Sequence, residues 1–347
     1  DALPISIIFV LIITSILFLS CQNDEQEEIC QSPYTEEDVR NEEALRAYLQ
    51  ASYVCSVDQV SVTKKTIQIA GKFIGEGVFY LSEISPYVDV TRMDTHSYKI
   101  RLTNSSFKIE LDRFVEREGI SYDRLLSKWV IVKQENGVDL LASHARYADE
   151  IQAIQFLEPI KLTNKKGMGG IIPNQYITDL SLLNISSGTI NIPITHFMHL
   201  TARSGDIEHM YGGKTYYIDE GYLRNTIDIA LLAATKERNI SVAAIILLDP
   251  AARCADPDLG AILQHPDNNG GTYTMPDLTN AESVNCYAAA LDFLAKRYCR
   301  IDNSYGRISH WIMHNEVDGG RDWANMGIHK NNRMNVITCF MIIRINE

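Results

Sequence analysis

The stretch HWIMHNEVD, from His310 to Asp318, is the segment of the chain that says most about its fold. Its first part is an apolar, strand-like run, and this run ends in Asn315 and Glu316. These polar residues add little to the packing of a buried strand. A buried carboxylate is costly unless it is paired or its pKa shifts. At the C-terminal edge of a parallel barrel, however, strand ends are where catalytic groups lie. The segment therefore predicts a site residue, provided that the preceding chain forms a parallel sheet.

From about residue 159 onward, apolar strand-like segments alternate with amphipathic helices. We expect strands at 165–172, 189–194, 241–249 and 307–316, and helices at 177–184, 219–238 and 279–299. We expect the last helix to open with a capping box formed by Thr279 and Glu282. Continuous apolar strands separated by such helices are typical of a parallel sheet covered by helices.

Four strand–helix units, with the Asn-Glu pair ending the fourth strand, correspond to half of an eight-unit barrel. A complete barrel of this kind needs at least ~200 residues, which is more than the segment 159–347 offers. We therefore expect an incomplete (β/α)8 TIM barrel that is cut short. A complete four-stranded α/β domain is the alternative.

Between residues 56 and 158 the hydrophobic period changes to two. Seven short runs fit strands: QVSVT, TIQIAGKF, GVFYLSEI, YKIRLT, SFKIELDRF, WVIVKQ and VDLLASH. In the fifth run Phe107, Ile109 and Leu111 alternate with polar residues, which predicts one buried and one solvated face. This density of strands favours an antiparallel β-sandwich. Such a domain could bind carbohydrate or only support its neighbour. The fold class is therefore a multidomain β plus α/β protein.

The N-terminal segment reads as an export signal. Within the expected signal segment 1–20, residues 3–20 are almost wholly apolar and are followed by Cys21 and the acidic run QNDEQEE. This pattern resembles a bacterial lipoprotein signal, with Cys21 as the lipidated residue, and an uncleaved membrane anchor is the alternative. Residues 21–55 are expected to form an acidic tether with one short helix, and Cys30 and Cys55 are the best candidates for a disulfide. The predicted location is the cell envelope, as an outer-membrane or surface lipoprotein of a bacterium.

Composition excludes several functional classes. The net charge of −12 and the lack of basic clusters argue against a nucleic-acid partner. No phosphate-binding loop, dinucleotide fingerprint or serine-nucleophile motif is present in the sequence, so we expect no cofactor. His310 and His314 are four residues apart, but on a strand and without a carboxylate at ligand spacing, so we expect no metal.

The chain also resembles known proteins. An Asn-Glu pair at the end of the fourth strand is similar to the clan A glycoside hydrolases. More narrowly, KKGMGGI, TINIPI, GGKTYYID and HWIMHNEVDGGRDWANMG resemble the domain of unknown function 5722 family, uncharacterised bacterial barrel proteins. The resemblance covers about residues 56–327, and the last segment is its most specific part.

That resemblance implies a retaining glycoside hydrolase, which needs two carboxyl groups about 5–5.5 Å apart. Glu316 would be the acid/base and Asn315 would bind the sugar 2-hydroxyl. The clan A nucleophile ends the seventh strand, which this chain lacks, so we expect the chain alone to be inactive. The candidate substrate-binding residues are His314, Asp318, Trp323, His196, His199 and Asp249. The two histidines stand where clan A usually has an arginine.

Three hypotheses stay open at this point. The first is a surface lipoprotein that hydrolyses a polysaccharide or glycan. The second is a non-catalytic glycan-binding lipoprotein that uses the same cleft. The third is a protein with a structural role in the cell envelope. A second carboxylate opposite Glu316 would favour the first hypothesis over the second.

Overall fold

The computed structural model describes residues 36–92, 98–117, 119–152, 158, 160–173, 175–266, 268 and 270–314. The expected signal segment with Cys21 and the site candidates Asn315, Glu316, Asp318 and Trp323 lie outside these residues, as does Cys30. Within them, no helix is long and apolar enough to cross a membrane.

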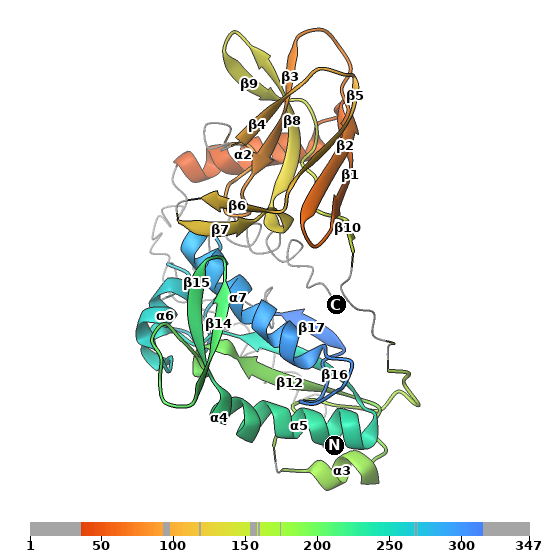
Figure 1. The fold of residues 1–347 in the computed structure, drawn as a ribbon, viewed down its shortest axis with the longest axis vertical. Coiled ribbons are helices and arrows are strands. Elements are labelled where there is room, and N and C mark those ends of the chain that lie inside the picture. The colour runs from red at the N-terminus through yellow and green to blue at the C-terminus, as the bar shows by residue number, and fades with distance from the viewer. Residues whose placement is uncertain are drawn as a thin grey trace, which may run out of the picture.

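The described N-terminal part contains one α-helix, one short 3-10 helix, two four-stranded sheets and a two-stranded hairpin (Figure 1). Its elements are α2 (Glu36–Gln50), β1 (Ser56–Val62), β2 (Thr66–Lys72), β3 (Val78–Ile84), β4 (Tyr98–Leu102), β5 (Ser106–Asp112), β6 (Phe114–Arg117), β7 (Ile120–Asp123), η2 (Arg124–Leu126), β8 (Lys128–Glu135), β9 (Val138–Leu141) and β10 (Glu150–Ile151). One sheet has the order β10-β1-β2-β5 and the other β4-β3-β8-β9, and β6 and β7 form a separate hairpin. All seven strands expected from the alternating pattern are present.

The two sheets share one core. Ile67 and Ile69 of β2 are fully buried together with Leu81 of β3 and Ile131 of β8. Neighbouring strands are antiparallel, except that β10 pairs in parallel with β1. Because side chains alternate between the two faces of a strand, each sheet turns one apolar face toward this core.

Helix α2 packs against the other face of the second sheet. Tyr48 is buried in a cluster with Ile84, Val130 and Val132, and its hydroxyl accepts a hydrogen bond from the backbone N–H of Ala145 at 2.6 Å. The helix was expected within a tether, but its buried tyrosine makes it part of the folded unit.

The C-terminal part is built on a parallel sheet. Its elements are β11 (Gly167–Met168), α3 (Ile177–Leu182), β12 (Ser187–Pro193), η3 (Ile194–His196), β13 (Met198–His199), β14 (Asp206–Tyr211), β15 (Lys214–Asp219), α4 (Glu220–Leu223), η4 (Arg224–Asp228), α5 (Ile229–Leu231), η5 (Leu232–Lys236), β16 (Ser241–Leu247), η6 (Ala251–Arg253), α6 (Pro257–Leu263), α7 (Ala281–Tyr298) and β17 (His310–Met313). The strand order β11-β12-β16-β17 follows the sequence, and every pairing is parallel. This confirms the predicted order of the four strands.

The helices cover this sheet with apolar faces. The segments α4, η4, α5 and η5 follow one another without a break, with π-helical stretches at η4 and η5. In α7 the apolar face is buried and consists of Val284, Tyr287, Leu291, Leu294 and Tyr298. The predicted capping box of α7 is wrong by one residue, because the side chain of Asn280 accepts the hydrogen bond from Ser283 N–H, and Glu282 instead pairs with Lys214.

An additional small sheet, in the order β13-β15-β14, is inserted after β12. The turn at its tip, Gly212–Gly213, reaches the N-terminal part, where the backbone N–H of Ser121 donates to the carbonyl of Gly212 at 3.0 Å. Gly212 has a φ of +56°, and a Cβ there would overlap the side-chain amide of Asn285 in α7. Any other residue would therefore strain the backbone and force Asn285 to move. The boundary near residue 159 stays a prediction.

Candidate functional site

The C-terminal edge of the parallel sheet gathers three of the four candidate residues that the structure describes. Thr195 and His196 follow β12, Asp249 comes two residues after β16, and His314 comes directly after β17. Because the three strands are parallel neighbours, their C-terminal ends lie at the same edge. The structure therefore brings together residues that are more than a hundred positions apart in sequence.

Asp249 is held as a carboxylate. Its Oδ2 accepts hydrogen bonds from Nε2 of His196 at 2.9 Å and from Oγ1 of Thr195 at 3.1 Å. Oδ1 faces the guanidinium of Arg253 at 3.7 Å. Burial opposes ionisation, but these hydrogen bonds and the charges of His196 and Arg253 outweigh it, so the pKa of Asp249 is lowered. Asp249 is thus a fixed negative charge at the edge.

His196 bridges Asp249 to the neighbouring helix. Its Nε2 donates to Asp249, and its Nδ1 lies 3.1 Å from the hydroxyl of Tyr222 in α4. Because the Nε2 proton is directed at Asp249, an unprotonated Nδ1 can accept the hydrogen bond of the Tyr222 hydroxyl. The side chain is 40% exposed, so part of the ring is open to solvent. Burial raises the pKa of Tyr222, and the nearby charge of Asp249 acts in the same direction, so the phenol keeps its proton.

His199 lies apart from the open edge. It is 1% exposed. Its Nδ1 pairs with Oδ2 of Asp206 at 3.2 Å, and its Nε2 accepts from the guanidinium of Arg203 at 3.0 Å. Because both ring nitrogens are engaged and the ring is buried, His199 organises the loop between β13 and β14. It has no nitrogen left for the substrate contact expected from the sequence.

His314 is a buried, neutral group behind the edge. Its φ is +66°, which is uncommon for a residue other than glycine. Nε2 lies 2.8 Å from the hydroxyl of Tyr287 in α7, and the two rings stack with centroids 5.5 Å apart. Burial lowers the pKa of His314 to about 3. At neutral pH the imidazole is therefore uncharged and fixed in position beside the start of the Asn315–Glu316 segment.

Three functional partners were not predicted from sequence. Thr195, Tyr222 and Tyr287 each bond a candidate residue, but none of them belongs to a spacing motif. The only signal for Thr195 is its place directly before His196, at the end of a predicted strand. Tyr222 and Tyr287 lie on helices, and only the fold brings them to the edge.

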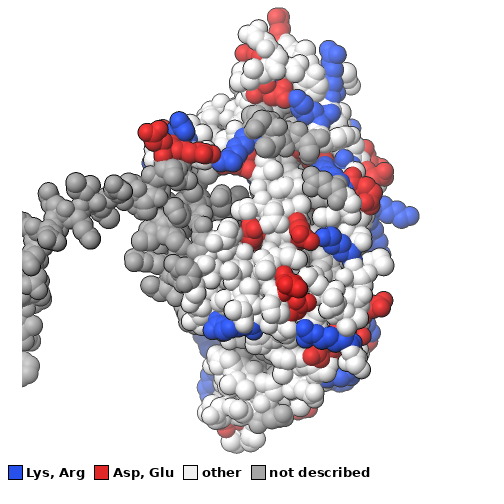
Figure 2. All heavy atoms as spheres, turned by 90° about the vertical axis from the view of Figure 1, so that its left-hand side faces the viewer, with Lys and Arg blue, Asp and Glu red and all other residues white. Residues whose placement is uncertain are grey.

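The described residues contain no group of three or more His, Cys, Asp or Glu side chains placed to hold a metal ion. Charged side chains are interspersed on the face shown in Figure 2, and the described residues form no basic cluster on that face. Cys55 is buried and free, and its sulfur accepts from the N–H of Ile74 at 3.4 Å.

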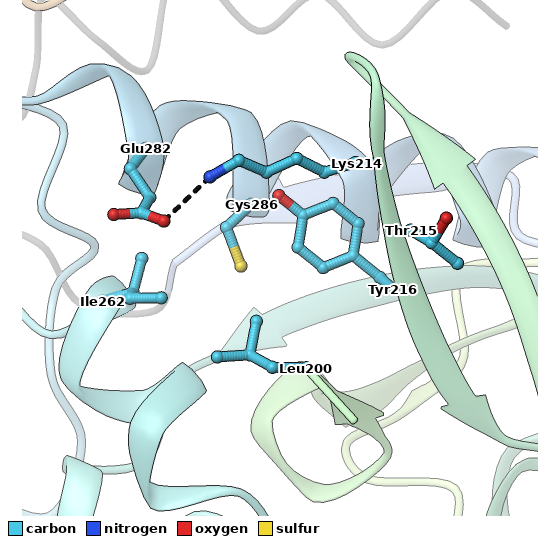
Figure 3. Close-up of a pocket in the computed structure, with 7 residues that line it drawn as sticks. All are labelled: Leu200, Lys214, Thr215, Tyr216, Ile262, Glu282 and Cys286. Atoms are coloured by element: carbon cyan, nitrogen blue, oxygen red, sulfur yellow. Dashed lines mark hydrogen bonds and ion pairs between the residues drawn. The ribbon is translucent and has the colours of Figure 1, made fainter. Parts of the chain in front are cut away.

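A separate cavity lies beside this edge, between the inserted sheet, α6 and the first turns of α7 (Figure 3). Its volume is about 240 Å³. Thr195, His196, Asp249 and His314 are not among its lining residues. The part of the chain that the structure describes thus has two distinct features near the strand ends, a polar edge and a cavity.

The parallel sheet, with helices between its strands and polar side chains at its C-terminal edge, defines an α/β protein. Residues 159–343 match the family described as "Family of unknown function (DUF5722)". The match covers more than half of the chain, and the chain belongs to this family.

Among solved structures, the chain is similar to glycoside hydrolases. One is the catalytic module of SpuA, a multi-modular glycogen-degrading pneumococcal virulence factor, at 9% identity and a TM-score of 0.22, covering 74% of this chain and 47% of that chain. Another is the β-D-glucuronidase of Dictyoglomus thermophilum, at 11% identity and a TM-score of 0.22, covering 84% and 43%. A third is the β-glucuronidase of Ruminococcus gnavus, at 11% identity and a TM-score of 0.20, covering 76% and 38%. The chain spans less than half the length of each. No protein with a curated description matches it.

Proposed function

We propose that this chain carries the acid/base side of a retaining glycoside hydrolase site that acts on a polysaccharide or glycan. The observation that carries the proposal is the shared edge of β12, β16 and β17, where His196, Asp249 and His314 lie and from which the chain continues into Asn315 and Glu316. In α/β proteins ligands bind outside the C-terminal ends of the strands. The family resemblance of the HWIMHNEVDGG segment supports the same assignment.

The proposed architecture is a β-sandwich followed by the first four units of a (β/α)8 barrel. Two facing sheets with a common core support the sandwich. Four parallel strands in sequence order, with helices between them, support the barrel. Barrel enzymes build their sites at the C-terminal edge of the strands, which is where the candidate residues gather.

In this proposal Glu316 protonates the leaving oxygen and then deprotonates water, and Asn315 binds the sugar 2-hydroxyl. The charge of Asp249 raises the pKa of a nearby carboxylic acid, as an acid catalyst requires. His314, neutral and held by Tyr287, adds no positive charge that would oppose this effect.

The remaining candidates contact the sugar in this proposal. Trp323 offers an aromatic face for an apolar sugar face, and Asp318 offers a hydrogen-bond acceptor. The exposed ring face of His196 lines the same edge. Each of these groups orients the substrate and takes no part in bond breaking.

A second candidate function is glycan binding without hydrolysis. It is favoured by the state of Asp249, which is the carboxylate that the described edge supplies. Its Oδ2 is already bonded by His196 and Thr195, and Oδ1 faces Arg253. A nucleophile needs a free carboxylate oxygen, and a residue held in this way serves binding better than attack.

The test compares wild-type protein that carries a complete barrel with Glu316→Gln in the same protein, and with Glu208→Gln as a control at an exposed glutamate. Hydrolysis of aryl glycosides with good and poor leaving groups is followed by NMR, which also shows the anomer formed first. We expect Glu316→Gln to slow substrates with poor leaving groups much more than activated ones, because only the former need proton donation. Equal rates for Glu316→Gln and wild type would exclude Glu316 as the acid. Glycan binding with no turnover in wild type would establish the second candidate.

We also propose that the protein is a lipoprotein of the bacterial cell envelope, anchored through Cys21. Cys21→Ala should abolish incorporation of labelled fatty acid and release the protein from the membrane fraction. Unchanged labelling of Cys21→Ala would refute this anchoring.

A further inference from the structure

The cavity beside the strand edge has an apolar floor. Leu200 follows β13, Ile262 comes from α6, and Cys286 from α7, and their side chains converge with the ring of Tyr216 from β15 (Figure 3). Tyr216 and Cys286 are 2% and 1% exposed. Burial raises the pKa of the Cys286 thiol to about 12, so the floor carries no charge at neutral pH.

The mouth of the cavity is polar and overall neutral. Lys214 Nζ of β15 lies 2.8 Å from Glu282 Oε1 in the first turn of α7. Their side chains are 37% and 55% exposed, so both reach solvent at the entrance. An ammonium has three N–H donors and a carboxylate has about four acceptor positions. The pair therefore keeps free donors and acceptors side by side after bonding to each other.

We propose that this cavity binds one uncharged pyranose residue, with adjacent hydroxyl groups bonded by Lys214 and Glu282 and the apolar C–H face of the ring turned toward Leu200 and Ile262. This inference rests on the proposed function only in choosing carbohydrate as the ligand class. It assigns a second sugar position outside the strand edge that holds His196 and Asp249.

Charge selects a neutral ligand. The Lys214–Glu282 pair carries no net charge, so an anion or a cation gains no net attraction from it. A charged ligand would also have to lose part of its hydration next to the apolar floor, which is unfavourable. A pair of neighbouring hydroxyls, each able to donate and accept, satisfies both charged groups without separating them.

Size selects a single ring. Pockets for drug-sized ligands have about 300–1,000 Å³, whereas this cavity has about 240 Å³. It is too small for a stretch of glycan chain but offers room for one sugar unit, either a terminal residue or a free monosaccharide. A small contact area with two charge-assisted hydrogen bonds predicts weak binding, in the millimolar range.

The test measures binding of free neutral hexoses, a hexuronate and a free amino acid by ligand-observed NMR and titration calorimetry. Two variants probe the cavity, Glu282→Gln at its mouth and Ile262→Trp to fill it. Glu135→Gln is the matched control, because Glu135 forms an exposed ion pair with Lys133 at 2.6 Å far from this cavity. Thermal unfolding of each variant verifies that it is folded.

We expect wild type and Glu135→Gln to bind a neutral hexose with the same dissociation constant. Glu282→Gln should weaken binding about three- to tenfold, since it loses charge-assisted hydrogen bonds but keeps its shape. Ile262→Trp should abolish binding. Absence of hexose binding to wild type, tighter binding of the hexuronate or the amino acid, or an unchanged dissociation constant in Glu282→Gln would each overturn the proposal.

The experiments distinguish a failure of the cavity proposal from a failure of the proposed hydrolase function. The cavity assay measures binding alone, and the binding that it assigns to the cavity is the part that Ile262→Trp removes and Glu135→Gln retains. A Glu316 effect on hydrolysis without hexose binding in the cavity would reject this inference and leave the proposed function standing. Hexose binding that is lost in Ile262→Trp, in a protein that hydrolyses nothing, would support the cavity alone.

Discussion

Acidification should destabilise this protein through His314, and the variant His314→Asn should remove that component. Asparagine is suited to the position because it accepts a φ near the observed +66° more readily than most residues and does not titrate. The imidazole is 6% exposed and stacked on Tyr287, so protonation would place a charge in an apolar setting. The folded protein therefore resists taking up the proton.

The direction and size of this pH effect follow from the linkage between protonation of His314 and folding. The folded-state pKa of His314 is about 3, whereas an unfolded histidine titrates near pH ~6.5. Below pH ~6.5 the unfolded chain binds a proton that the folded chain refuses, so stability falls as the pH drops toward the folded pKa and is unaffected above pH ~7. Each pKa unit corresponds to about 1.4 kcal/mol, so two units of acidification should cost about 2–3 kcal/mol.

The assay is urea unfolding of both proteins at about pH 7.5 and about pH 4.5, followed by tryptophan fluorescence. Carboxylates with lowered pKa values, such as Asp249 and Asp292, also destabilise the protein on acidification, but they do so equally in wild type and variant. The difference between the two pH-dependent losses isolates His314. If His314→Asn loses as much stability on acidification as wild type, the imidazole is not the buried neutral group described above.

Two further predictions concern packing. Gly212→Ala should lower the free energy of unfolding by about 1–3 kcal/mol more than Gly137→Ala, because both glycines have positive φ but only at Gly212 would a Cβ meet Asn285; equal losses by urea unfolding would contradict this. Asp228→Asn should cost about 3–5 kcal/mol by leaving Arg297 without its buried partner, to which Asp228 Oδ2 is bonded at 2.6 Å. The double variant Asp228→Asn/Arg297→Met should recover part of that loss, and a single-variant loss below about 1 kcal/mol would show that the pair is not desolvated.

The elements predicted best are those with a strong hydrophobic period. The alternation of Phe107, Ile109 and Leu111 identifies β5 because every second side chain of an edge strand packs on the core. The continuous apolar run of β16 identifies a strand covered on both faces, and the structure buries most of it. In such segments the hydrophobic pattern of the sequence matches the burial of the side chains in the fold, so the pattern alone is enough to predict the strand.

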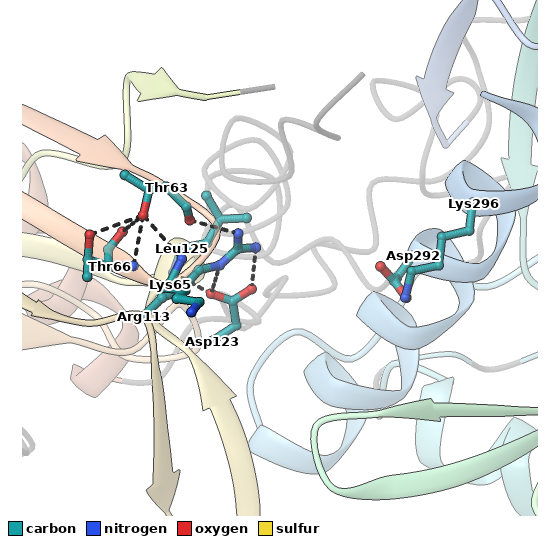
Figure 4. Close-up of polar contacts among 8 residues, drawn as sticks. All are labelled: Thr63, Lys65, Thr66, Arg113, Asp123, Leu125, Asp292 and Lys296. Atoms are coloured by element: carbon teal, nitrogen blue, oxygen red, sulfur yellow. Dashed lines mark hydrogen bonds and ion pairs between the residues drawn. The ribbon is translucent and has the colours of Figure 1, made fainter. Parts of the chain in front are cut away.

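Elements held by long-range polar contacts could not be predicted in this way. The hairpin β6–β7 is stabilised by Arg113, whose Nε and Nη2 donate to Asp123 at 2.9 and 2.8 Å and whose Nη1 donates to the carbonyl of Thr63 at 3.2 Å (Figure 4). In the sequence these two residues read as ordinary surface charges. Burial lowers the pKa of Arg113, but the hydrogen bonds and charge of Asp123, with smaller contributions from Tyr211 and Asp292, raise it overall. Nothing in the local sequence indicates that Asp292 of α7 acts on this ion pair.

The polar contacts within the candidate site could not be predicted from the local sequence either. Strand-end position alone predicted His196 and Asp249 as edge residues, but not that they would bond to each other. Since the nitrogens of His196 are taken up by Asp249 and Tyr222, the ring can bond a sugar hydroxyl only by giving up one of them. An arginine at this position would have donors to spare, because its guanidinium has five N–H groups. In the proposed site, His196 stands where the clan A resemblance implies an arginine; it would position Asp249 and leave hydrogen bonding to the sugar to other groups of the edge.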